Sequence, residues 1–196
     1  MLRRTRVSVS VARLAVAVWF GTMLVLGAGL LAKHVVALPA PTNSERLSKS
    51  LSSLRASKAQ DQWLAVHVLY AECRCSQRIV AHLISTVRPS GWQEVVLWVG
   101  NGAPDLALER AYRVKRLTSV ELARLGVDAA PLLVVLDPQN HVRYTGGYTD
   151  RKQGPVIEDV RILAQARRAD TLASLPVFGC AVSDRLKRAL AILPAP

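Results

Sequence analysis

Two cysteines are separated by a single residue in the tetrapeptide Cys73-Arg74-Cys75-Ser76. An apolar run precedes them and an amphipathic run follows, so they lie where a strand is expected to lead into a helix. Backbone N–H groups and the helix dipole stabilise an anion at a helix N-terminus, and a thiolate benefits from both. Arg74 would add to the thiolate population. Because the thiolate is the form that attacks disulfides and binds metals, the pattern indicates a redox or metal-binding site.

The elements on either side of the thiols follow from residue type and spacing. The segment Trp63–Ala71 is rich in β-branched and aromatic residues and predicts a buried strand. The segment Gln77–Val87 predicts a helix, because its apolar residues recur at helical spacing. Those residues are Ile79, Val80, Leu83, Ile84 and Val87. The strand and the helix therefore hold the two thiols at a turn between them.

The rest of the chain alternates between strand and helix signals. The Thr118–Glu121 pair has the pattern of a capping box and marks the start of one helix. The other elements expected are a strand over Trp92–Val99, a short helix over Ala103–Arg113, the capped helix ending near Gly126, a strand over Leu132–Leu136 directly after Pro131, an edge strand over His141–Thr145, a long helix after Gly154-Pro155, and a final helix that follows Cys180 and reaches Ile192.

The first 40 residues predict a membrane anchor. Arg3, Arg4 and Arg6 precede the uncharged apolar run Leu14–Ala32, which has nearly the length that spans a bilayer. The alternative is a signal peptide cleaved after Ala37 or Ala40, although signal peptides usually have a shorter apolar stretch. The positive-inside rule places the N-terminus in the cytoplasm. For a bacterial host, we therefore expect a single-pass protein of the inner membrane whose domain faces the periplasm or the cell exterior.

Residues 41–61 are expected to form a stalk between the membrane and the domain. Asn43 or Ser44 can cap a polar helix that carries leucines on one side, at positions 47, 51 and 54. The domain proper is then expected to cover residues 62–196.

The charge pattern does not favour a nucleic-acid partner. The chain has a formal net charge of +12, but basic residues are mixed with acids beyond residue 40, and only 5% of the residues are aromatic. Nucleic-acid binding would need a basic stripe with interleaved aromatic residues. Ser76 has no adjacent histidine and acid, so the sequence does not indicate a hydrolase either.

The order of elements and the proline before the strand at 132 give the chain a likeness to a known fold. It resembles the thioredoxin-like superfamily, which implies an α/β βαβαββα sandwich with, here, an N-terminal transmembrane helix and a C-terminal helical extension. In that family a cis proline lies against the active-site cysteines, and the resemblance gives this role to Pro131, with Ala130 supplying the preceding backbone. The chain also resembles the membrane-anchored RedB-like proteins, which carry a Cys-x-Cys-Ser turn.

Two departures from the family pattern concern the thiols. Members commonly have two cysteines separated by two residues and preceded by tryptophan, whereas here one residue separates them and Glu72 precedes them. If Cys73 aligns with the nucleophile of the family, Ser76 stands where the resolving cysteine would be. Glu72 would also oppose thiolate formation and partly offset Arg74.

The odd number of cysteines leaves the pairing open. The chain has three, so one remains free if two form a disulfide within the chain. One alternative is a bond between Cys73 and Cys75, and the other joins Cys73 or Cys75 to Cys180. In an exchange reaction with exported protein thiols or disulfides, Cys73 would attack and Cys75 or Cys180 would resolve the mixed disulfide. The structural alternative is that the cysteines only brace the tail.

No cofactor is expected for thiol exchange, but Cu(I) is an alternative. Two thiolates and an imidazole suit Cu(I), as in copper-delivery proteins of the thioredoxin-like fold. The available histidines are His34, His67, His82 and His141. We expect His67 to pack within its strand and His82 to be exposed. The chain has no pair of Cys-x-x-Cys motifs, which argues against structural zinc.

Overall fold

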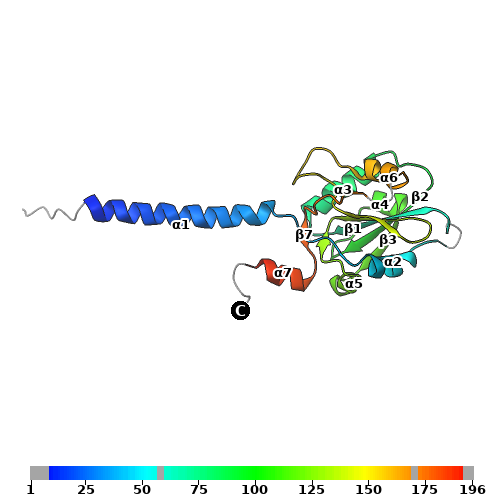
Figure 1. Ribbon diagram of the computed structural model, residues 1–196, viewed down its shortest axis with the longest axis horizontal. Coiled ribbons are helices and arrows are strands. Elements are labelled where there is room, and N and C mark those ends of the chain that lie inside the picture. The colour runs from blue at the N-terminus through cyan, green and yellow to red at the C-terminus, as the bar shows by residue number, and fades with distance from the viewer. Residues whose placement is uncertain (1–8, 57–59, 169–171, 192–196) are drawn as a thin grey trace, which may run out of the picture. The chain divides into compact units, whose positions relative to one another are not determined.

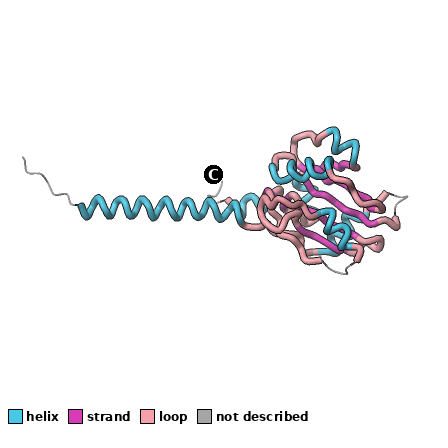
Figure 2. Tube along the Cα trace, turned by 90° about the horizontal axis from the view of Figure 1, so that it is seen from above, coloured by secondary structure: helices cyan, strands magenta, loops and turns pink. Residues whose placement is uncertain are grey.

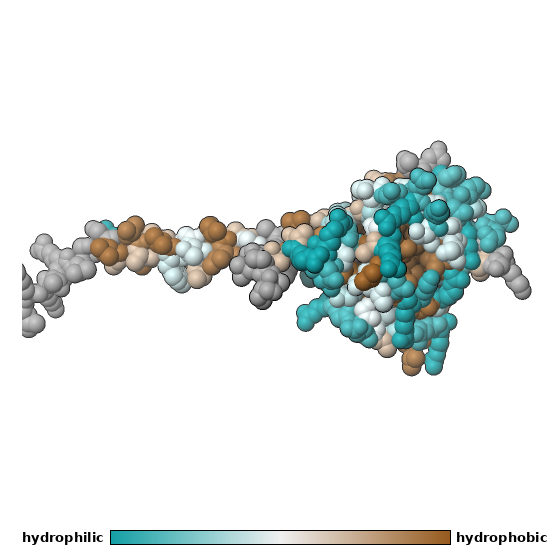
Figure 3. Space-filling view, turned by 90° about the horizontal axis from the view of Figure 1, so that it is seen from below, coloured by the Kyte–Doolittle hydropathy of each residue, from teal (hydrophilic) through white to brown (hydrophobic). Residues whose placement is uncertain are grey.

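A computed structural model of the chain describes residues 9–56, 60–168 and 172–191 (Figure 1). The chain divides into two compact units, residues 1–36 and residues 37–196. Helix α1 (Val9–Val35) belongs to the first unit. Its segment Val11–Leu30 is long and apolar enough to cross a membrane, although a signal sequence meets the same criterion. Figure 3 shows apolar side chains along this helix. The arginines at positions 3, 4 and 6, on which the predicted membrane anchor partly depends, lie outside the described residues.

The second unit is built around a five-stranded sheet of order β3-β2-β1-β5-β6. Its strands are β1 (Trp63–Tyr70), β2 (Trp92–Val99), β3 (Arg113–Leu117), β5 (Leu132–Leu136) and β6 (Val142–Gly146). Strand β1 pairs in parallel with β2, and β2 pairs in parallel with β3. Strand β1 also pairs antiparallel with β5, and β5 pairs antiparallel with β6. Strand β1 is therefore the central strand, and the next helix begins beyond the carboxyl end of this strand.

Helices cover both faces of this sheet, with the strands between them (Figures 1 and 2). Helices α3 (Arg74–Ser85), α4 (Leu106–Ala111) and α6 (Asp159–Ala166) contribute to the apolar core on one face. Helices α2 (Ser44–Ser52) and α5 (Ser119–Arg124) contribute to the core on the other face. The last helix, α7 (Asp184–Leu190), has no buried side chain. Successive residues of β1 point to opposite faces, so Ala65 joins the first core and Val66 the second.

This arrangement is the thioredoxin-like fold, as the resemblance implied, with two additions that the sequence pattern did not predict. The first is β3, an edge strand whose burial alternates weakly because three of its five residues are exposed. The second is a small sheet in which β4 (Ala129–Ala130) pairs antiparallel with β7 (Cys180–Ala181). The capping box at Thr118 and Glu121 is present, as predicted.

Helix α2 is part of the domain and does not form the separate stalk expected from the sequence. Asn43 caps the helix through a bond from the Arg46 N–H to its side chain. Leu47 and Leu51 are each 1% exposed and pack in the core shared with the sheet. The leucines predicted to share one side of this helix therefore face the sheet, and the folded unit begins before residue 62.

Leu51→Ala is expected to lower the free energy of unfolding of the full chain by about 2–5 kcal/mol, because it removes a buried side chain and leaves a cavity. The measurement is urea denaturation followed by tryptophan fluorescence. Lys49→Ala is the control, since Lys49 is exposed on the same helix. Equal stability of the two variants would mean that α2 lies outside the core.

A buried ionic cluster joins β1, β2, the loop before β2 and α6. Arg88 donates to Glu94 at 2.6 Å and to Asp159 at 2.6 Å. His67 is fully buried, with its ring nitrogens 2.9 Å from the Tyr148 hydroxyl and 2.9 Å from the Glu94 carboxylate. Burial favours the neutral form of Glu94, but the hydrogen bonds from His67 and Arg88 outweigh it and lower its pKa to about 2. The cluster therefore holds Glu94 in its charged form.

The helix pattern predicted that His82 would be exposed, but it is partly buried. Its side chain is 21% exposed, and its Nε2 lies 2.8 Å from the buried Asp159 carboxylate. The prediction was wrong because the periodicity of one helix cannot reveal a partner such as Asp159, which lies in α6, far away in the sequence. His67 packs within its strand, as predicted.

The buried ionic cluster predicts how the free energy of unfolding depends on pH. Because the pKa of Glu94 is about 2 in the folded chain and 4.5 in its ordinary state, the unfolded chain binds a proton first as the pH falls. The stabilising contribution is complete above pH 4.5 and is lost as the pH falls from 4.5 toward 2. Glu94→Gln is expected to flatten the acid slope of the free energy of unfolding. Glu109→Gln, at an exposed ion pair, is expected to leave the slope unchanged.

Candidate thiol site

Cys73 lies at the point where β1 passes into α3. Its N–H donates to the Tyr70 carbonyl at 3.0 Å, and its own carbonyl accepts from the Gln77 N–H at 3.0 Å. Cys73 is the N-cap residue of α3, as the sequence predicts for a thiol at a helix N-terminus, and it is fully buried. The helix directs its N-terminal N–H groups toward this end, which favours negative charge on the sulfur.

Ser76 has a structural position in this turn. It is fully buried, and its hydroxyl accepts a hydrogen bond of 3.0 Å from the Tyr70 N–H. The serine thus ties the first turn of α3 to the end of β1.

The Ala130–Pro131 peptide bond lies beside Cys73 and is cis, as the resemblance implies. The Cys73 Sγ is 3.8 Å from the Ala130 carbonyl oxygen. Strand β5, which starts directly after Pro131, pairs with β1, which ends just before Cys73. The pairing of these two strands is what brings the thiol and the proline to the same edge.

Cys73 is bonded to Cys180, and Cys75 is free. The two bonded residues are 107 positions apart in the sequence, and their Cα atoms are 6.0 Å apart. Cys75 is partly exposed. Of the pairings left open by the sequence, the bond between Cys73 and Cys75 is therefore not the one present. The buried Cys73 is shielded, while Cys75 and Cys180 both remain partly exposed.

The segment that carries Cys180 is held beside the cis peptide as a strand. Cys180 is paired with Ala130, and Ala181 with Ala129. A Cβ atom on Gly179 would lie 1.9 Å from the Ala130 carbonyl oxygen and 2.6 Å from the Pro131 Cδ. Since those distances are far below van der Waals contact, only glycine fits at this position without a shift of the backbone.

Further contacts fix the segment on both sides of the disulfide. The Leu38 N–H donates to the Val177 carbonyl at 2.8 Å, and the Val182 N–H donates to the Asp128 carbonyl at 2.7 Å. Val177 and Val182 are 1% and 0% exposed and belong to the core that contains α2. We define residues 175–183 as the tail strand.

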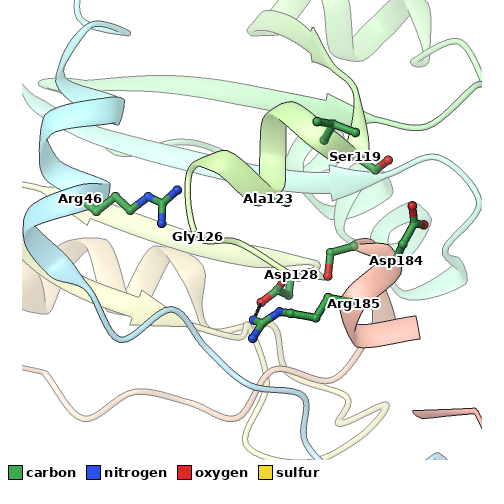
Figure 4. Close-up of a pocket in the computed structure, with 9 residues that line it drawn as sticks. Arg46, Ser119, Ala123, Gly126, Asp128, Asp184 and Arg185 are labelled. Carbon is green, nitrogen blue, oxygen red and sulfur yellow. Dashed lines mark hydrogen bonds and ion pairs between the residues drawn. The ribbon is translucent and has the colours of Figure 1, made fainter. Parts of the chain in front are cut away.

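Helix α7 follows the tail strand and lies at the rim of a cavity of about 480 Å³ (Figure 4). Arg185 forms an ion pair with Asp128, and its side chain is 81% exposed. Arg46 of α2 also lines this cavity. Figure 4 shows the Arg185–Asp128 pair beside the loop that leads into β4. The end of the tail is therefore held by a surface contact, whereas its middle is held by the disulfide and two buried valines.

The two charged residues that flank Cys73 differ in their surroundings. The Glu72 carboxylate accepts a hydrogen bond of 2.9 Å from the Asn101 N–H, so it is engaged with the loop after β2. Arg74 is exposed.

Several of the side chains named as candidate copper ligands have other partners in the structure. Within residues 9–56, 60–168 and 172–191, no group of three or more His, Cys, Asp and Glu side chains is arranged to hold a metal ion. Cys73 and Cys180 are bonded to each other. His141 is 72% exposed and pairs with Asp137, and His67 belongs to the ionic cluster. The side chain of His34 lies outside what the structure describes.

Sequence reasoning missed two residues that shape the site. Gly179 precedes Cys180 directly, and a glycine beside a cysteine in an apolar segment was a signal of close backbone approach. Leu38 had no such signal, because its role depends on a bridge to Val177 from the other end of the chain.

The comparisons with known proteins bear on the fold. No protein-family model matches the chain, and no curated protein matches it. An uncharacterized conserved protein from Geobacillus kaustophilus is 16% identical with a TM-score of 0.50, over 63% of this chain and 77% of that one. A hypothetical protein from Sinorhizobium meliloti is 15% identical with a TM-score of 0.44, over 64% and 82%. The thioredoxin domain of a thiol-disulfide oxidoreductase from Bacteroides vulgatus is 14% identical with a TM-score of 0.40, over 57% and 81%. From strand order, helix placement and the cis proline together, we conclude that residues 37–196 adopt a thioredoxin-like fold.

Proposed function

We propose that this protein carries out thiol–disulfide exchange with other exported proteins, and that its redox pair is Cys73 and Cys180. The observation that carries the proposal is the Cys73–Cys180 bond at the N-terminus of α3, beside the cis Ala130–Pro131 peptide. A helix N-terminus stabilises the thiolate of Cys73, which makes Cys73 both a good nucleophile and a good leaving group.

The reaction balances as two exchange steps. The reduced protein attacks one sulfur of a partner disulfide with the Cys73 thiolate, and the other partner sulfur leaves as a thiolate. Cys180 then attacks the Cys73 sulfur of the mixed disulfide, which forms the Cys73–Cys180 bond and releases the second partner thiol. The partner gains two electrons and this protein loses two. An external dithiol returns the protein to its reduced form, and the same steps in reverse would oxidise a partner.

The remaining site residues have supporting roles in this proposal. Pro131 and Ala130 keep the backbone next to Cys73 in a fixed position, and Ser76 holds the turn. Arg74 supplies positive charge near the thiolate. Cys75, being outside the bonded pair, is not needed for turnover.

The proposed location is the outer side of a bacterial inner membrane. The apolar helix α1 would act as the single-pass anchor, with the basic N-terminus in the cytoplasm. Anchored, exported RedB-like proteins with a Cys-x-Cys-Ser turn are the narrower group to which the proposal assigns the chain.

Thiol mapping tests the proposal against a static brace. The full chain in detergent is equilibrated with glutathione buffers of increasing reducing strength, labelled with a maleimide and analysed by mass spectrometry. We expect one labelled residue, Cys75, in the oxidised protein, and three in the reduced protein, with full reversal on reoxidation. A Cys73–Cys180 bond that stays closed in dithiothreitol while the protein is folded would make it a brace and overturn the proposal.

A further inference from the structure

The tail strand lies on the edge that an incoming partner would need. Cys73 is fully buried, and the strand that carries Cys180 is paired with β4 along Ala129 and Ala130. While the strand remains there, no other polypeptide can pair with that edge or reach the Cys73 sulfur. A partner large enough to be a protein must therefore take the place of the tail strand.

The disulfide can be opened without prior movement of the tail. Residue Cys180 is partly exposed whereas Cys73 is fully buried, so we take the Cys180 sulfur as the point of attack for a small dithiol, with Cys73 leaving as the thiolate at the N-terminus of α3. The second thiol of the reductant then frees Cys180. After that step, the tail strand is held by its backbone bonds, by Val177 and Val182, and by the exposed Arg185–Asp128 pair.

We infer that the tail strand is an internal copy of the partner, and that the substrate is an extended polypeptide whose reacting cysteine directly follows a glycine. This inference rests on the proposed function and names its substrate class. A partner cysteine bonded to Cys73 takes the position of Cys180, so the residue before it takes the position of Gly179. At that position any side chain would meet the Ala130 carbonyl oxygen. Apolar residues three before and two after the cysteine would occupy the sites of Val177 and Val182.

The same exchange of strands links resolution to release. The Cys180 thiolate attacks the Cys73 sulfur of the mixed disulfide from the side opposite the partner's sulfur, and the tail strand pairs with β4 again once the partner has left. The new Cys73–Cys180 bond forms as the partner's sulfur leaves as a thiolate, so no further reactant is required. Closure of the tail thus follows directly from release of the partner.

The test uses a synthetic peptide with the sequence of residues 174–184, its cysteine carrying a thionitrobenzoate leaving group. The protein is the full chain with Cys75→Ser and Cys180→Ser, so that Cys73 is its one thiol. Attack by Cys73 forms the peptide–Cys73 disulfide and releases coloured thionitrobenzoate. We expect the same peptide with Gly179→Ala to react about tenfold more slowly or worse. Free Ellman's reagent serves as the probe of Cys73 reactivity alone.

The same substitution in the protein is expected to act in the opposite direction. With Gly179→Ala in the chain, the tail strand no longer fits against Ala130, so the edge is open more often and the glycine peptide reacts about threefold faster or more. Circular dichroism checks that this variant is folded. Arg185→Ala, which removes only the exposed ion pair, is the milder second variant and should accelerate the reaction in the same direction.

The outcomes separate the two proposals. If the two peptides react at equal rates while Cys73 releases thionitrobenzoate rapidly from Ellman's reagent, the partner does not bind at the β4 edge that the tail strand uses. That result would overturn this inference but not the proposed thiol exchange. A Cys73 that reacts with neither the peptides nor Ellman's reagent would overturn both. A slower alanine peptide together with a faster Gly179→Ala or Arg185→Ala chain would support the inference.

Discussion

Cys73→Ser is expected to abolish disulfide exchange by the full chain, lowering the rate about a thousandfold or more, because it removes the nucleophile. Cys180→Ser should permit one attack and then stop, so that a mixed disulfide between Cys73 and the substrate accumulates. Turnover is measured as the reduction of a self-quenched fluorescent glutathione disulfide with dithiothreitol as the electron source. The trapped species is identified by mass spectrometry in a separate reaction of the pre-reduced Cys180→Ser chain with the disulfide, after dithiothreitol has been removed.

Cys75→Ser is the matched control for these variants. It removes a thiol two residues from Cys73 that is outside the disulfide, so turnover is expected to stay within about threefold of the unaltered chain. The opposite pattern, loss of turnover with Cys75→Ser and retention with Cys180→Ser, would identify Cys73 and Cys75 as the working pair.

Arg88→Met is expected to lower the free energy of unfolding by about 3–5 kcal/mol, because it leaves two buried carboxylates without their cation. Those carboxylates, Glu94 and Asp159, have side chains only 8% and 0% exposed. Arg88 also links β2 to α6, so its loss should weaken the packing of α6 against the sheet. The measurement is urea denaturation of the full chain at neutral pH.

Arg116→Met provides the comparison for the buried pair. Arg116 pairs with Glu109 at the surface, where their side chains are 64% and 36% exposed. An exposed pair contributes about 0–1 kcal/mol, so this variant should be nearly as stable as the unaltered chain. Equal effects for the two arginines would show that the cluster contributes no more than a surface pair.

The position of Cys73 could be predicted from local sequence because a strand, a turn and a helix each have their own periodicity. The run Trp63–Tyr70 and the apolar spacing of α3 place the cysteine at the start of the helix. The cis proline came from the resemblance, since the sequence around Pro131 alone does not distinguish cis from trans.

The pairing of the cysteines could not be predicted from the sequence. It depends on how β7, which lies within the tail strand, pairs with β4, and β4 and β7 have two residues each, too few for a periodic signal. Strand β3 was missed for a related reason, because its exposed edge residues do not alternate clearly between apolar and polar. The leucines of α2 were seen on one side of a helix, but the surface that they contact is formed by distant strands.

The distance along the chain between the bonded cysteines constrains the order of events during synthesis. Cys73 and Cys75 leave the ribosome together, whereas Cys180 follows Cys73 by 107 residues. A nascent polypeptide that ends before position 180 therefore exposes an unprotected pair of sulfur atoms to whatever oxidant or chaperone it meets. The mature linkage can be closed only after all the intervening strands have been made, so its appearance reports that translation has passed the tail.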